Sequence, residues 1–138
     1  MWLWLVASTG RAALWGFDPQ LMCEVADAVV VAEVTSQEVT WDEGPVAGLT
    51  TTSWLWVDRV LRGDGIGRSL TLRTRGGQRG AHVQWVEHEA RLRMDGRYLL
   101  VLTDTDAGWR VIAGEHGAIP VADDRALETA LDALGGCR

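Results

Sequence analysis

Three histidines, His82, His88 and His116, are the side chains best suited to metal binding or proton transfer near neutral pH. His82 and His88 are six positions apart, and Glu87 and Glu89 flank the second of them. On an extended strand this spacing places two residues on one face but about 20 Å apart, which is too far for one metal ion. Nucleophile, phosphate-binding and dinucleotide-binding motifs are missing from the sequence. We therefore expect no catalytic residue, no metal site and no cofactor; the alternative is an enzyme whose site the sequence does not reveal.

A second set of side chains suits binding rather than catalysis. The stretch Thr50–Arg75 alternates like two strands joined by a glycine-rich turn. Trp54 and Trp56 share one face of the first strand, and Arg73 and Arg75 share one face of the second. We call these four residues the Trp/Arg face, and we predict that it binds an acidic protein segment or an anionic glycan.

The pairing of these two strands follows from the turn and from burial. A loop at Asp64–Ile66 with one bulge between Asp58 and Val60 keeps apolar residues opposite one another. That register also sets each tryptophan opposite an arginine, Trp56 with Arg73 and Trp54 with Arg75. Such pairs contribute about 0.5–1 kcal/mol each when exposed. The alternative is that the C-terminal helix covers both indoles, which leaves the arginines as a solvated rim.

The distribution of charge favours the same region. The chain carries a net charge of −6, and all 13 of its basic residues are arginine. Residues 58–79 hold six arginines and two aspartates, a net +4, so the remainder of the chain carries −10. An acidic chain of this kind does not neutralise phosphates, and we expect no nucleic-acid binding. A solvated, arginine-rich strand surface is the alternative interpretation of the basic stretch.

The first residues look like an export signal. Residues 1–13, MWLWLVASTGRAA, are short and apolar and then small, which predicts a truncated secretory signal whose true start lies upstream. An N-terminal strand or a disordered tail is the alternative. No apolar run is long enough to cross a bilayer, so we expect no transmembrane segment. Residues 14–138 then form a single domain, and we expect it to be secreted or to lie in the periplasm or cell envelope.

Two cysteines lie near the two ends of that domain. In an exported protein, a disulfide between Cys23 and Cys137 would tie the first element to the last. Two free thiols are the alternative. A bridge requires the two Cα atoms to lie within about 7 Å.

The remaining pattern predicts a mainly β domain with a helix at each end. Asp18 and Pro19 begin a helix that extends to about Ala28, and an aspartate caps a helix over Asp124–Leu134. Five or six strands lie between them, at 28–41, 49–61, 68–75, 97–103, 109–114 and 118–121, with 82–90 as a short irregular strand. Short strands with glycine-marked turns favour a small antiparallel barrel of the OB type, and a β-sandwich is the runner-up.

Three stretches carry a resemblance to a known class of proteins. They are ADAVVVAEV at 26–34, VDRVLRG at 57–63, and DGRYLLVL at 95–102 followed by a hairpin and WRV. In order and spacing they resemble uncharacterised exported bacterial domains, which are similar to the netrin-like domain and to the tissue inhibitors of metalloproteinases. The resemblance covers residues 18–121 and implies an OB-type barrel with a non-enzymatic binding or accessory role.

The inhibitory mechanism of that class does not carry over to this chain. In the metalloproteinase inhibitors, the N-terminal cysteine of the mature chain coordinates the zinc of the target. Cys23 lies well inside the expected mature chain and within a helix, so the free amine that such chelation needs is absent there. We expect a protein-binding module that acts through the Trp/Arg face, with a glycan-binding OB-type module as the alternative.

Overall fold

The computed structural model describes residues 18–42, 48–135 and 137. The predicted signal segment at residues 1–13 lies outside them. Helix α2 (Pro19–Val25) begins as expected, because the Asp18 carboxylate accepts hydrogen bonds from the backbone N–H groups of Gln20 and Leu21 at 3.0 and 3.5 Å. The expectation that it extends to Ala28 is wrong, because Ala28 already belongs to the first strand.

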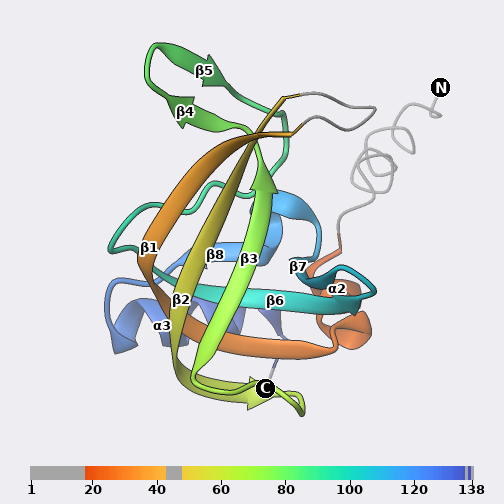
Figure 1. Ribbon diagram of the computed structural model, residues 1–138. Coiled ribbons are helices and arrows are strands. Elements are labelled where there is room, and N and C mark those ends of the chain that lie inside the picture. The colour runs from red at the N-terminus through yellow and green to blue at the C-terminus, as the bar shows by residue number, and fades with distance from the viewer. Residues whose placement is uncertain (1–17, 43–47, 136, 138) are drawn as a thin grey trace, which may run out of the picture.

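The strands form one six-stranded antiparallel sheet and one small hairpin (Figure 1). The large sheet has the order β3-β2-β1-β6-β7, and β8 also pairs with β6. Its strands are β1 (Ala28–Asp42), β2 (Gly48–Arg62), β3 (Ser69–Arg75), β6 (Arg97–Thr105), β7 (Gly108–Val111) and β8 (Ala118–Pro120). The hairpin consists of β4 (Gly77–Arg79) and β5 (His82–Gln84), where the sequence had predicted only one irregular strand.

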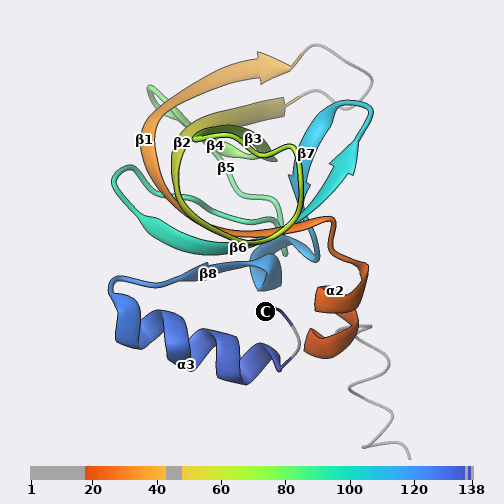
Figure 2. The ribbon, with the colours of Figure 1, turned by 90° about the horizontal axis from the view of Figure 1, so that it is seen from below.

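The large sheet curls round on itself (Figure 2). Its two outer strands are β3 and β7, and no backbone pairing joins them among the described residues. The prediction of a mainly β, antiparallel fold with helices near both ends is therefore confirmed, whereas closure into a barrel is not found.

Two apolar cores lie on the two faces of this sheet. The inner core fills the curl, and its buried members are Ala28, Val30, Ala32, Val34, Leu55, Val57, Leu70, Leu72, Ala90, Leu92, Tyr98, Leu100, Leu102 and Ala118. The helix core packs α2 and α3 against β1 and β6, and its buried members are Met22, Cys23, Val29, Val31, Leu99, Val101, Val121, Leu127, Ala130, Leu131, Leu134 and Cys137. Figure 2 shows α3 lying along β8 on the outside of the curl. Alternate residues of the first half of β1 enter opposite cores, which is why residues 28–34 form a nearly continuous apolar run.

The C-terminal helix α3 (Asp124–Leu134) has the predicted bounds. The Asp123 carboxylate accepts a 2.8 Å hydrogen bond from the N–H of Ala126, and Gly135 ends the helix with a φ of 74°. A disulfide joins Cys23 of α2 to Cys137 just beyond α3, with the two Cα atoms 4.9 Å apart. Of the two alternatives that the sequence left open, the bridge and not two free thiols is thus present, and it fastens the two helices to each other.

The predicted register between β2 and β3 is wrong by four residues. Trp54 faces Thr71 and Trp56 faces Ser69, so neither tryptophan lies directly opposite an arginine. The reason is that β2 leaves β3 after Val57 and continues to Arg62 paired with β1 alone. The expected bulge does occur at Asp58, but in the ladder between β2 and β1. A shift by an even number of residues leaves every side chain on the same side of the sheet. The four residues of the Trp/Arg face therefore still lie on one side, although the predicted register is wrong.

Candidate functional site

Trp54 and Trp56 are exposed on the outer face of β2. Their neighbours Ser53, Leu55 and Val57 point into the curl and are buried, whereas the two indoles are 40% and 44% exposed. The alternative that α3 covers them is therefore wrong, since α3 packs into the helix core on β1 and β6. Large aromatic side chains with this exposure on a regular strand are available to a partner.

Arg73 and Arg75 lie on the same outer face of the adjacent strand β3. They alternate with the buried residues Leu72 and Thr74, and they face Thr52 and Thr50 of β2. Arg73 is thus the diagonal neighbour of Trp54, at a separation that long side chains can bridge. The structure therefore brings the four residues of the Trp/Arg face onto one surface, in a staggered rather than a paired arrangement.

The cation that contacts Trp56 is Arg68, which the sequence analysis did not assign to the face. Its Cζ atom lies 5.7 Å from the centroid of the Trp56 ring. The carbonyl of Arg68 accepts a 2.8 Å hydrogen bond from the N–H of Val57, which holds the residue beside the end of the ladder. Its membership in the arginine-rich stretch was the only signal available, because its position depends on the true register.

The two arginines of β3 differ in the hydrogen bonds and ion pairs that they form with other residues. Glu89 accepts hydrogen bonds from the backbone N–H and from Nε of Arg75, at 2.7 and 3.4 Å. The Arg75 side chain nevertheless remains 60% exposed. Arg73 makes no ion pair with any residue that the structure describes. Arg73 is therefore the freer of the two to bind an anion.

Charge changes sign across the outer surface of the sheet. On β1, the exposed Glu33 faces Trp56 and the exposed Glu38 faces Thr52. On the other side of β2, the exposed side chains of β3 include Arg73 and Arg75. An anionic partner is repelled at β1 and attracted at β3, so the basic half of the surface is its expected location.

A groove of about 570 Å³ runs between β3 and β7, the two unpaired outer strands. We call it the seam groove. It is lined by Asp42, Thr50, Ser69, Leu70, Thr71, Arg73, Thr74, Arg75, Ala107, Gly108, Trp109 and Arg110. The Trp/Arg face and the seam groove thus share Arg73 and Arg75.

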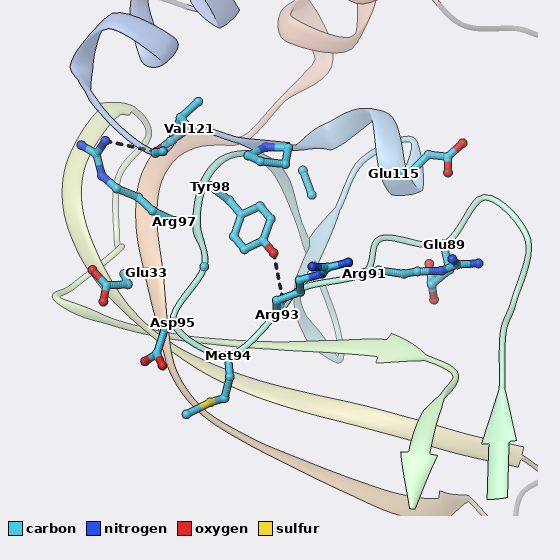
Figure 3. A pocket seen from close by; sticks show the side chains of 14 residues that line it. Glu33, Glu89, Arg91, Arg93, Met94, Asp95, Arg97, Tyr98, Glu115 and Val121 are labelled. Carbon is cyan, nitrogen blue, oxygen red and sulfur yellow. Dashed lines mark hydrogen bonds between the residues drawn. The ribbon is translucent and has the colours of Figure 1, made fainter.

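A larger pocket of about 780 Å³ lies around β6 and the loop before it (Figure 3). One of its three arginines, Arg97, donates hydrogen bonds to Asp58 Oδ2 and to the carbonyl of Val121, both at 3.3 Å. The hydroxyl of Tyr98 accepts a 2.8 Å hydrogen bond from the backbone N–H of Arg93. These groups hold the loop and β8 to the sheet, so they fulfil structural roles.

His82 and His88 contact different partners. His82 packs edge-on against Trp41 with ring centroids 5.3 Å apart, and His88 lies between Glu87 and Glu115 at 3.2 and 3.4 Å. Within residues 18–42, 48–135 and 137, no three histidine, cysteine, aspartate or glutamate residues are grouped so as to hold a metal ion. None of the described helices combines the length and the apolar character needed to cross a bilayer.

Comparison of the sequence with models of protein families, and with curated proteins, finds no match. The resemblance to netrin-like domains therefore stays a prediction.

Proposed function

We propose that this protein is a non-enzymatic binding module whose Trp/Arg face holds an acidic segment of a partner protein. The observation that carries the proposal is the exposure of Trp54 and Trp56 beside Arg73, which lacks an ion-pair partner among the described residues. Tryptophan and arginine are the residues most often responsible for binding energy in protein interfaces. The net charge of +4 over residues 58–79 selects an acidic partner.

The proposal includes an OB-type architecture and export. A curled antiparallel sheet with a gap between its outer strands is compatible with a partly open barrel, and in OB folds the surface of the second and third strands binds ligands. The Trp/Arg face lies on the second and third strands of this chain. The disulfide between Cys23 and Cys137 is consistent with an oxidising compartment, such as the periplasm or the extracellular space.

The test measures binding of a glutamate-rich peptide to the purified protein and to four single variants. We expect Trp56→Ala and Arg73→Ala each to weaken binding by about tenfold or more, because each removes a desolvated contact. The thermal midpoint should change little, since both side chains are exposed.

Matched controls are available elsewhere on the surface. Trp85 is 60% exposed outside the Trp/Arg face, and Arg125 is exposed on α3. Trp85→Ala and Arg125→Ala should bind the peptide like the wild type. Equal binding by all four variants would refute the proposal. Retention of a sulfated oligosaccharide in place of the peptide, lost in Trp56→Ala, would assign the face to an anionic glycan.

A further inference from the structure

The two ends of the ladder between β2 and β3 show which residues of β3 direct their backbone N–H and C=O groups toward β2 and which direct them away from it. At one end the carbonyl of Arg68 accepts from the N–H of Val57 at 2.8 Å, and at the other the N–H of Gly76 donates to the carbonyl of Leu49 at 2.7 Å. In an antiparallel pair, every second residue directs its backbone groups to the partner strand. The even-numbered residues between these ends therefore bond to β2.

The odd-numbered residues of β3 direct their backbone groups away from β2, into the seam groove. The N–H of Arg75 points away from β2, because it donates to Glu89 Oε2 at 2.7 Å. Ser69, Thr71 and Arg73 have the same phase, and no backbone hydrogen bond joins them to other described residues on that side. Unpaired N–H and C=O groups in a row form a template for another strand.

The opposite wall of the seam groove is β7. The N–H of Ile112 donates to the carbonyl of Val101 at 2.9 Å, which sets the phase of the β6–β7 ladder and turns the backbone of Trp109 and Val111 away from β6. Each neighbouring pair along β3-β2-β1-β6-β7 is antiparallel, so β3 and β7 run in the same direction. The Cα atoms of β3 and β7 approach to within 8 Å of each other, less than the roughly 9.6 Å that a strand between them requires. An extended segment antiparallel to β3 therefore pairs with β3 alone, and β7 has to move outward to admit it.

The side chains of the seam groove define the chemistry of that segment. Arg73 and Arg110 are exposed on its two walls, and neither forms an ion pair with another described residue. Arg75 adds a third cation, and Asp42 is the single acidic residue of the lining. Trp109 is partly buried and packs against the inner core. An occupant with acidic side chains outward and apolar side chains toward Trp109 satisfies both sets of residues.

We propose that the seam groove binds an extended acidic segment of a partner protein as an additional strand, paired antiparallel with β3 through Thr71 and Arg73. This inference rests on the proposed function and specifies how the acidic partner binds. The residue of the segment that lies opposite Arg73 exchanges backbone hydrogen bonds with it, and its side chain lies on the same side of the sheet as the Arg73 side chain. This residue should therefore be acidic. It follows that the acidic residues of the segment are those whose backbone N–H groups point at β3. Main-chain pairing then gives affinity, and Arg73 and Arg110 give specificity for alternating acidic residues.

The first experiment uses the wild-type protein and a synthetic peptide of alternating glutamate and valine. One derivative carries methyl groups on the backbone nitrogens of the glutamates, and the matched derivative carries them on the backbone nitrogens of the valines. We expect the first derivative to bind at least tenfold more weakly than the second, because its glutamates have lost the N–H groups that would bond to β3. Equal binding by the two derivatives would overturn the strand-pairing mode.

The second experiment changes the protein at the edge strand. Thr71→Pro removes an N–H that faces the seam groove and leaves the ladder with β2 intact, as proline requires in an edge strand. It should weaken binding of the unmethylated peptide about tenfold, whereas Thr71→Val, which keeps the N–H, should not. Arg110→Ala should weaken binding, and Arg125→Ala is its control.

The two proposals fail in different ways. Suppose that Trp56→Ala abolishes binding, whereas Thr71→Pro and methylation of the glutamate backbone nitrogens do not. The Trp/Arg face then binds the partner without strand pairing, and only the strand-pairing inference is refuted. If the peptide binds equally well to Trp56→Ala and Arg73→Ala, the proposed function itself is wrong. The peptide derivatives decide the matter even if Thr71→Pro does not fold.

Discussion

Asp27 joins the start of β1 to the end of β6 through its carboxylate. Its Oδ2 atom accepts a 2.8 Å hydrogen bond from the N–H of Asp104 and a 2.9 Å bond from the hydroxyl of Thr103. These two bonds favour the charged form and hold the pKa of Asp27 below its ordinary value of 3.8, while slight desolvation acts in the opposite direction. The carboxylate therefore stabilises the fold more in its ionised form than in its protonated form.

The pH dependence of this contribution follows from the direction of the shift. Because the folded pKa lies below the unfolded one, the stabilisation is present above pH 3.8 and is lost as the pH falls through the folded value. We expect Asp27→Asn to lower Tm at neutral pH, and the gap from wild type to close in strong acid. Thermal melts of both proteins across this range check it. Asp64→Asn, in an exposed turn, should leave Tm at neutral pH nearly unchanged. A gap between Asp27→Asn and wild type that does not depend on pH would contradict the assignment.

Alternation along a strand predicts the face on which each side chain of the Trp/Arg face lies, but not its contacts with the neighbouring strand. Trp54 and Trp56 alternate with buried residues, and Arg73 and Arg75 do so on the next strand, so their common face was predictable from the sequence. The contact of Arg68 with Trp56 was not predictable, because it depends on where β2 and β3 separate.

At the scale of whole elements, local signals determined α3 and the start of α2 better than the end of α2 or the strand register. Asp123 and Gly135 bound α3 on either side, and the helix was predictable to the residue. The register between β2 and β3 was not predictable, because the last residues of β2 pair with β1 and not with β3. The β4–β5 hairpin also depends on a distant contact, since the Gln84 side chain accepts a 2.6 Å hydrogen bond from the N–H of Leu49.

The disulfide joins elements that are 114 positions apart in sequence. Closing a loop of this length reduces the entropy of the unfolded chain and stabilises the fold by about 4–5 kcal/mol in the loop-entropy account. We expect the double variant Cys23→Ala with Cys137→Ala to melt about 10 to 20 °C below the wild type.

Calorimetry with and without a thiol reductant measures this effect. The wild-type protein should lose stability in the reductant, and the double variant should be insensitive to it. Both cysteines are buried in the helix core, so reduction should require prior opening of α2 and α3. An unchanged Tm on reduction, with loss of the bridge verified by mass, would contradict the expected role.

At the scale of the whole molecule, β1 couples the two cores. Val29 and Val31 enter the helix core, and Val30 and Ala32 enter the inner core, all four with no exposed surface. Opening either core removes the packing from one face of β1, so it weakens the strand that supports the other core. The helices and the curled sheet should therefore unfold together, although they lie on opposite sides of the sheet.

This coupling predicts one unfolding transition for variants of either core. Leu100→Ala in the inner core and Leu127→Ala in the helix core should each lower the free energy of unfolding by about 2–5 kcal/mol. Both leucines are fully buried, whereas Leu21 is 51% exposed, so Leu21→Ala should change the free energy by less than about 0.5 kcal/mol. Urea titrations followed by tryptophan fluorescence, to which Trp41, Trp54, Trp56 and Trp109 of the sheet contribute, and by far-ultraviolet circular dichroism should coincide for every variant. A separate loss of helical signal in Leu127→Ala, before the fluorescence changes, would show that the helices are a detachable layer and that β1 does not couple the two cores.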